Sequence, residues 1–245
     1  MGSIRAERPW RSVPAGTAAF TALCVAALIA LRAAETGSAA DARGLPPPPD
    51  SDVVTVLSGG DTSGAGYALT LYLQAFDNQP GVSLPFASLD YGRVEAWLST
   101  ALAVDPASQY PMLMATHLYG QVLTRPDKQR RMAEYVYARF LEDPDRRWPW
   151  LAHMAIMAKH RLGDPRLAIR YADALRDHAN GASVPAWVRQ MHIFLREDVG
   201  EIDSARALLG GLLDSGAVTD PQEFAFLSQR LKAMGSVGNS SPVTK

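Results

Sequence analysis

The hydrophobic pattern of the chain changes near residue 32. Residues 12–31 form one uncharged apolar run between Arg11 and Arg32. From about residue 66 onward, apolar residues instead recur at spacings of three and four, which is the period of an amphipathic helix. The pattern therefore predicts one apolar N-terminal helix followed by a separate all-α domain.

The apolar run, taken as residues 12–32, is about as long as the roughly 20 residues that cross a bilayer as a helix. Arg5 and Arg8 precede it against the single acid Glu7, and basic residues mark the cytoplasmic side of a membrane helix. We therefore expect residues 1–11 to be a cytoplasmic basic arm and residues 12–32 a transmembrane helix. The rest of the chain would then lie in the periplasm, anchored to a bacterial inner membrane.

A cleaved signal peptide is the alternative, because Ser38, Ala39 and Ala40 are small enough for a signal peptidase. The apolar run is longer than a usual signal core of about 7 to 15 residues, which favours the uncleaved anchor. Cys24 follows Leu23, which is not small, so a lipid-modified cysteine is not expected. A single cysteine also excludes an intrachain disulfide.

Composition divides the remainder of the chain. Residues 33–52 are rich in small residues and proline, including the run Pro46–Pro49, and too poor in apolar residues to fold alone. We expect a disordered linker there and a disordered tail at residues 235–245. The folded domain is then predicted at residues 53–234.

The folded domain contains an internal repeat with a period of 37 residues. This shift aligns Trp150 with Trp187, Met154 with Met191, Ile156 with Ile193, Gly163 with Gly200, Ala168 with Ala205 and Leu175 with Leu212. Each unit is predicted to be a helix, a tight turn at the glycine and a second helix. In the first unit, Asp164 can cap the second helix and Pro165 can take its first position.

These residues resemble the tetratricopeptide repeat family, whose units place Leu-Gly-Asp at the turn and an alanine four residues on. Leu162-Gly163-Asp164 with Ala168 matches that pattern. The segment from Asp90 to the Asp105-Pro106 step looks like the second helix of another unit, and Asp143-Pro144 ends a further one.

The resemblance implies an all-α solenoid of about four helical hairpins, expected at residues 66–104, 109–142, 148–178 and 184–214. A capping helix is expected at residues 221–234, with Asp220 as its cap and Glu223 completing a capping box. The repeats are longer than the family's usual 34 residues, and Asn78 to Ser88 looks like an insertion.

Tetratricopeptide stacks line a concave groove with their first helices, so the resemblance implies a groove that holds a peptide or partner helix. The candidate groove residues are Trp150, His153, Met157, His160, Trp187, Gln190, Phe194 and Glu197. The expected function is a membrane-anchored scaffold that binds a protein or peptide partner in the cell envelope. The alternative is that several of these side chains are packed under the next repeat or the capping helix.

Other chemistry has little support in the sequence. The glycine-rich loop at residues 58–66 lacks the Gly-Lys-Ser/Thr step of a phosphate-binding loop. His153 and His160 lie roughly 10 Å apart along one helix, too far for one metal ion. No catalytic residue, cofactor or metal is therefore expected, and an enzyme or nucleotide-dependent factor using the loop remains the alternative.

Charge excludes one further class of function. Residues 1–32 hold four arginines and one glutamate of the chain's 24 basic and 25 acidic residues, which leaves 20 basic and 24 acidic residues for the exported part. No clustered basic face is visible, so nucleic-acid binding is not expected. A structural subunit of a membrane complex, without a peptide groove, is the remaining alternative.

Overall fold

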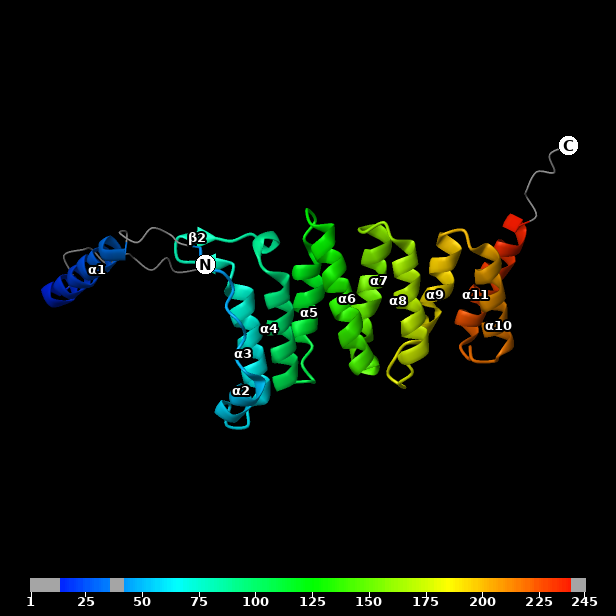
Figure 1. Cartoon of the computed structure of the whole chain (residues 1–245), viewed down its shortest axis with the longest axis horizontal. Helices are drawn as coiled ribbons and strands as arrows, with labels where there is room; N and C mark the ends of the chain where they lie inside the picture. Colours follow the sequence, from blue (N-terminus) through cyan, green and yellow to red (C-terminus); the bar gives the residue numbers. More distant parts are fainter. Residues whose placement is uncertain (1–13, 36–41, 239–245) are drawn as a thin grey trace, which may run out of the picture. The chain divides into compact units, whose positions relative to one another are not determined.

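The computed structural model describes residues 14–35 and 42–238, and these are mostly α-helical. The described residues divide into two compact units, the first within residues 14–43 and 78–83 and the second within residues 44–77 and 84–238. Figure 1 labels the α-helices of both units and strand β2.

The first unit contains helix α1 (Ala15–Glu35) and a short β-hairpin. Strand β1 (Asn78–Gln79) pairs antiparallel with β2 (Val82–Ser83). Gln79 binds the backbone of Arg43 twice, because its Oε1 accepts from the Arg43 N–H and its Nε2 donates to the Arg43 carbonyl, both at 2.9 Å. The segment predicted to be an insertion, Asn78 to Ser88, therefore begins with a β-hairpin that hydrogen-bonds to the backbone of Arg43.

Helix α1 confirms the predicted apolar helix. Within it, the 19 residues Ala15–Ala33 are long and apolar enough to cross a membrane, and none of them is buried. A signal sequence would meet the same criteria. The helix ends three residues beyond the predicted boundary at residue 32, and the predicted basic arm at residues 1–11 lies outside the described residues.

The second unit is a series of helices that pack side by side in chain order (Figure 1). They are α2 (Ser51–Leu57), α3 (Thr62–Ala75), α4 (Tyr91–Val104), α5 (Tyr110–His117), α6 (Pro126–Glu142), α7 (Pro144–His160), α8 (Pro165–His178), α9 (Ala186–Asp198), α10 (Ile202–Asp214) and α11 (Pro221–Gly238). Two 3₁₀ turns, η2 (Phe86–Ser88) and η3 (Tyr119–Gln121), precede α4 and α6. The four predicted hairpins correspond to the pairs α3 and α4, α5 and α6, α7 and α8, and α9 and α10.

Three predicted helix boundaries are wrong. Helix α3 begins at Thr62 rather than near residue 66. Helix α7 begins at Pro144 rather than near residue 148, and the buried Arg147 in its first turn donates to the Arg139 carbonyl and to Glu142. Helix α11 continues to Gly238, although the disordered tail was predicted from residue 235. The rest of that tail lies outside the described residues.

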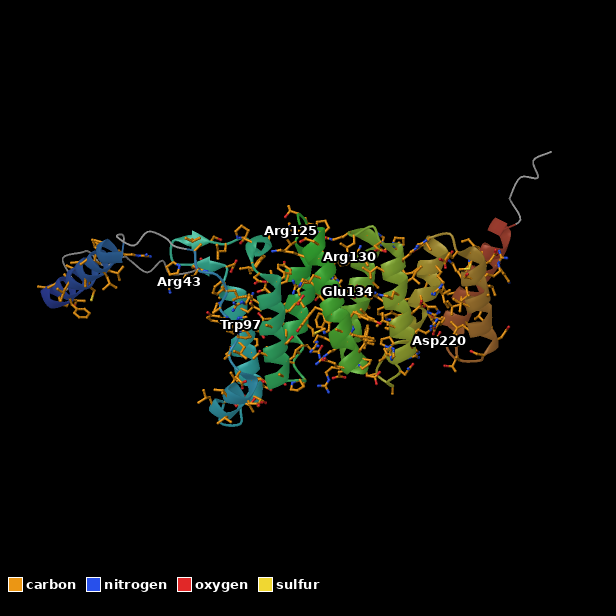
Figure 2. All side chains as sticks on the ribbon, in the orientation of Figure 1. Arg43, Trp97, Arg125, Arg130, Glu134 and Asp220 are labelled. Carbon is orange, nitrogen blue, oxygen red and sulfur yellow. The ribbon has the colours of Figure 1, made fainter. Side chains whose placement is uncertain are left out.

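The predicted disordered linker at residues 33–52 is also wrong for its second half. Leu45 is buried in the core of the second unit, and the indole Nε1 of Trp97 donates to the Pro46 carbonyl at 2.9 Å. A buried indole N–H needs an acceptor, and this segment supplies it. Figure 2 marks Trp97 on α4. Helix α2 then begins at Ser51, with Asp50 as its cap.

The structure contains the predicted helix caps and glycine turns, but one predicted capping box is not formed. Asp164 accepts a hydrogen bond from the Leu167 N–H at 2.9 Å, as a cap of α8. Gly163 and Gly200 take φ values of +61° and +85° at the two repeat turns, which glycine adopts without steric cost. Asp220 caps α11, but the side chain of Glu223 bonds Gln190 instead of completing the capping box.

We call α3, α5, α7, α9 and α11 the first helices, and α4, α6, α8 and α10 the second helices. Both sets contribute to the main core, which includes Leu73, Leu98, Phe140, Leu151 and Tyr171. A smaller core cluster joins α9 and α10 to α11.

Candidate functional site

Successive first helices contact one another through aromatic rings. The pairs are Tyr67 with Tyr110 from α3 to α5, His117 with His153 from α5 to α7, Trp148 with Trp187 from α7 to α9, and Phe194 with Phe226 from α9 to α11. The first helices therefore lie next to one another, and part of the predicted groove is used to join them.

On α7, Trp150 and His153 face α5. The Nε1 of Trp150 donates to Gln109 Oε1 at 2.6 Å, and its ring meets His117 edge-on. His153 stacks on His117 with ring centroids 4.3 Å apart and planes at 25°. Both side chains are half-buried at this contact.

His153 is held in one tautomer by a neighbouring amide. Gln121 Nε2 donates to His153 Nε2 at 3.2 Å, which requires that ring nitrogen to be unprotonated. Burial lowers the pKa of His153, and the nearby His117 and Arg161 lower it further. The next candidates along α7 differ from each other, since Met157 is buried and His160 is exposed.

On α9, three candidate residues face α11. Gln190 is buried and its Nε2 donates to Glu223 Oε1 at 2.6 Å. Glu197 forms an ion pair with Arg230 at 2.9 Å, and the Phe194 ring lies 6.5 Å from that of Phe226. Trp187 is the exposed member of the set on this helix.

The prediction of eight open groove residues is therefore wrong for Met157 and Gln190. Both side chains are buried, and α11 packs directly on Gln190. The alternative, that some of these side chains pack under neighbouring elements, is correct for them. The 37-residue alignment also fails locally, because Ile156 is half-exposed while the aligned Ile193 is buried.

The structure exposes a different set of apolar side chains on the first helices. Tyr67, Leu71, Ile156, Trp187 and Phe226 are each between 40 % and 57 % exposed, and we call them the first-helix face. Of these five residues, only Trp187 is among the candidates predicted from the sequence. The signal that could have found the others is an apolar residue on the side of the helix opposite its core positions.

Ile156 illustrates how this face is formed. The buried residues of α7 include Leu151, Met154 and Ala155, which point into the core. His153 contacts α5 and Trp148 contacts α9. At 100° per residue, Ile156 lies between those two contacts and points away from the core. Helices α3 and α5 contain no Lys, Arg, Asp or Glu, so their part of the first helices is uncharged.

Polar contacts join three of the second helices. Arg131 of α6 forms a bidentate pair with Glu95 of α4, at 2.7 and 2.9 Å. At the next junction, Glu134 of α6 forms an ion pair with Arg170 of α8. Figure 2 labels Glu134 on α6. The Tyr137 and Tyr171 rings stack at the same junction. The junctions of α4 with α6 and of α6 with α8 therefore each contain an ion pair between oppositely charged side chains.

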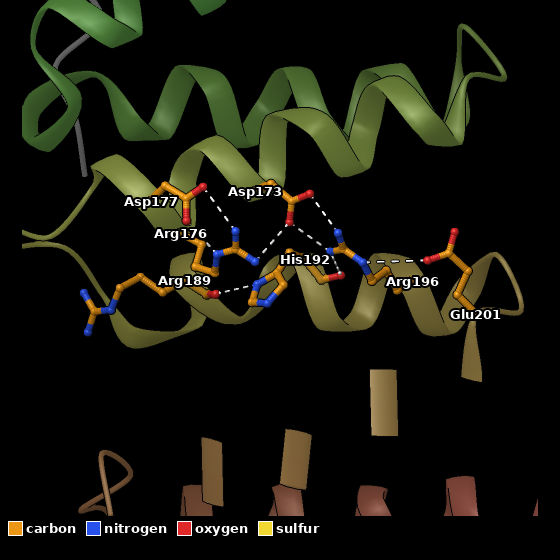
Figure 3. A network of polar contacts seen from close by, with 7 residues as sticks. All are labelled: Asp173, Arg176, Asp177, Arg189, His192, Arg196 and Glu201. Carbon is orange, nitrogen blue, oxygen red and sulfur yellow. Dashed lines mark hydrogen bonds and ion pairs between the residues drawn. The ribbon is translucent and has the colours of Figure 1, made fainter. Parts of the chain in front are cut away.

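A polar network joins α8 to α9 (Figure 3). Arg196 donates to both carboxylate oxygens of Asp173, at 2.9 and 2.8 Å, and Arg176 also approaches Asp173. The buried His192 donates from Nδ1 to the Arg189 carbonyl at 2.7 Å. Burial lowers the pKa of His192, so the ring is favoured in its neutral form. This network joins the polar side chains of α8 to those of α9.

The glycine-rich loop at residues 58–66 forms the connection from α2 to α3. Gly59 and Gly60 take positive φ values, and Asp61 caps α3 by accepting from the Gly64 N–H at 2.9 Å. Residues 62–66 of the loop belong to α3 itself. Across residues 14–35 and 42–238, no group of three or more His, Cys, Asp or Glu side chains could hold a metal ion.

No protein-family model matches the chain, and neither a curated protein nor a solved structure does. The resemblance to the tetratricopeptide family therefore stays a prediction, and any function assigned to the first-helix face rests on its residues.

Proposed function

We propose that this protein is a membrane-anchored, tetratricopeptide-like scaffold that binds a protein or peptide partner through its first-helix face. The observation that carries the proposal is the exposure of Leu71, Ile156, Trp187 and Phe226 on alternate helices of one domain. Large apolar side chains exposed on a folded domain are typical of a surface that binds a partner when they lie close together. The proposed role is binding, without catalysis.

The chemistry of the face suits a partner that contributes apolar side chains. Trp and Tyr are enriched among the residues that dominate binding energy at protein interfaces. Trp187 is also held in place by the ring of Trp148, so little side-chain entropy would be lost when a partner covers it. The uncharged helices α3 and α5 would impose no desolvation cost of buried charge on such a partner.

The anchor is proposed from α1 and the residues before it. Helix α1 has the length and composition of a membrane span, and Arg5, Arg8 and Arg11 precede it. By the positive-inside rule, α1 would place the helical domain in the periplasm of a bacterial cell. The partner is then expected among the proteins of the cell envelope.

Site-specific photo-crosslinking in intact cells tests the proposed function. A photoreactive amino acid at Ile156 should give a discrete adduct with one envelope protein. The matched control is Arg166, which is exposed on the second helix α8 and should give no such adduct. Adding Phe226→Ala to the Ile156 variant should weaken the adduct. Equal labelling from both positions, or none from Ile156, would rule out the first-helix face as the binding surface.

A further inference from the structure

The segment before α2 lies against aromatic side chains of α3 and α4. The indole Nε1 of Trp97 on α4 donates to the Pro46 carbonyl at 2.9 Å. The Tyr72 ring of α3 stacks on the Trp97 ring, with centroids 4.8 Å apart and planes at 27°. Beside Pro46, Leu45 is buried in the core cluster that contains Trp97. We call residues 45–49 the proline strap.

The sequence of the strap dictates its backbone form. Each of residues 45–48 precedes a proline, which disfavours the α-helical conformation, and each proline ring fixes its own φ at about −65°. These restraints favour a polyproline II helix, which has about three residues per turn and no internal hydrogen bonds. Burial follows that period, since Leu45 is buried, Pro48 is half-buried and the other three prolines are exposed. The strap therefore presents one face, Leu45 and Pro48, to the domain.

The contact has the chemistry of a recognition site for such a helix. Polyproline II segments typically bind surfaces lined with aromatic rings, and they lose little entropy because they are ordered before binding. Trp97 supplies a ring and a hydrogen-bond donor, and the free Pro46 carbonyl is the acceptor. Neither the strap nor the two aromatic side chains carry a charge at neutral pH. The ligand that fits is thus an extended apolar peptide with one leucine anchor.

Few contacts hold the strap and the helix that follows it. Within residues 44–60, all of which the structure describes, Leu45 is the one buried residue. Helix α2 buries none of its seven residues, and so short a helix is marginal in water by itself. After α2, Gly59 and Gly60 have φ values of +60° and +100°, with no atom within 4 Å of an added Cβ. The segment can therefore leave the domain at the cost of one side chain and the Trp97 bond.

We propose that α3 and α4 form a binding site for an extended Leu-Pro-Pro segment, and that the proline strap is its intramolecular ligand. The tether gives the strap a high effective concentration, which keeps the site closed. Gly59 and Gly60 are the hinge about which the strap leaves. A protein that presents an extended leucine followed by prolines fits the open site, because it repeats the Leu45 side chain and the Pro46 acceptor. No residue of this site belongs to the first-helix face.

Limited trypsin digestion of the full chain in detergent measures release of the strap. Arg43 is the one trypsin site within residues 33–92, and cleavage there tracks the population in which the adjoining strap is released. Trp97→Phe keeps an aromatic ring but removes the N–H donor, so cleavage after Arg43 should be about tenfold faster.

Trp150→Phe is the matched control for this digestion. It removes the same kind of indole hydrogen bond, here to Gln109, and should leave the cleavage rate after Arg43 unchanged. An unchanged rate for Trp97→Phe would overturn the proposal. Equal acceleration by both substitutions would do so too, because it would indicate general opening of the domain.

A peptide added in trans tests whether the surface is a binding site. The probe is a fluorescent peptide with the sequence of residues 43–50, and its anisotropy reports binding to the full chain. Leu45→Asp should release the strap, because burying a carboxylate is costly, and should let the peptide bind. The unsubstituted chain, whose site is occupied, should bind at least about tenfold more weakly. Adding Trp97→Phe to the Leu45→Asp chain should weaken binding about tenfold.

Three results of the peptide experiment would overturn the proposal. They are no binding to the Leu45→Asp chain, equal binding to that chain and the unsubstituted one, and equal binding of a peptide that itself carries Leu45→Asp. Neither measurement involves the Ile156 adduct or the location of the chain in a membrane. The proposed function and this binding site can therefore fail separately.

Discussion

The indole ring of Trp187 meets that of Trp148 edge-on, with ring centroids 5.5 Å apart and planes at 80°. Edge-on packing is a favoured geometry for two aromatic rings. Trp148 is half-buried against the core, while Trp187 remains 47 % exposed. One tryptophan of the pair thus supports the helix contact, and the other is presented to solvent.

Trp150 and Trp187 also differ in exposure, since Trp150 is half-buried and Trp187 is exposed, and substitutions of the two should have unequal effects. Trp150→Ala should lower the free energy of unfolding by about 3 kcal/mol, since it removes a packed ring and its bond to Gln109. Trp187→Ala should cost about 1 kcal/mol, because it loses only one ring contact. Denaturant unfolding of the detergent-solubilised chain measures both. A cost for Trp187→Ala equal to that of Trp150→Ala would place Trp187 in the core instead of on the first-helix face.

The turn before α10 predicts a pure backbone effect. Gly200 has a φ of +85°, and an added Cβ there would meet no atom within 4 Å. Gly200→Ala should therefore destabilise the domain by about 1 to 2 kcal/mol, through strain in the left-handed region alone. Gly200→Val should cost more, because a β-branched residue is worse in that conformation.

A matched control lies in the next helix. Gly210 also has open space around its Cα, but it has no positive φ and lies inside α10. Gly210→Ala should stabilise the domain by about 0.5 to 1 kcal/mol, since alanine is the better helix former. If both alanine variants shift the denaturation midpoint in the same direction, the assignment of strain at Gly200 is incorrect.

The buried histidine in Figure 3 predicts a dependence of stability on pH. The pKa of His192 is lowered in the folded state, mainly by burial, so the folded protein resists protonation more than the unfolded chain does. Its contribution is fully present above the unfolded pKa of about 6.5 and decreases as the pH falls below that value. The melting temperature should therefore be lower at about pH 5 than at about pH 7.5.

One substitution identifies the group responsible. His192→Gln should make the melting temperature less dependent on pH, because the titrating ring is removed. His153 also has a lowered pKa, so part of the dependence should survive His192→Gln. An unaltered pH profile for His192→Gln would exclude this histidine as the source.

The proposed topology predicts opposite behaviour of two reporters. Alkaline phosphatase fused after Lys245 should be active in a bacterial host, because the enzyme matures only outside the cytoplasm. A fluorescent protein that matures only in the cytosol should stay dark at the same position. Leu23→Arg with Leu28→Arg should release the chain from the membrane fraction, since arginine is costly in the bilayer centre. A fluorescent fusion that is bright and phosphatase-inactive would reverse the orientation.

Helix positions and turns could be predicted from the sequence because they depend on local interactions. The Asp164 cap, the first-turn proline at Pro165 and the positive φ of Gly163 each involve residues within one turn of helix. The 3.6-residue period located the helix pairs for the same reason. The packed segment at Leu45 was missed, because nothing near it in the chain indicates that Trp97 requires an acceptor from residue 46.

The exposed and buried members of the candidate site were decided only by the tertiary structure. Gln190 and Trp187 occur three residues apart on one amphipathic helix, yet α11 covers Gln190 and leaves Trp187 open. That outcome depends on where a helix some 30 residues later crosses α9, and the period of the sequence carries no information about it. By itself, the sequence determined an apolar N-terminal helix and a following helical domain. Which helix faces stay open was settled by helix packing, since burial depends on every neighbour at once.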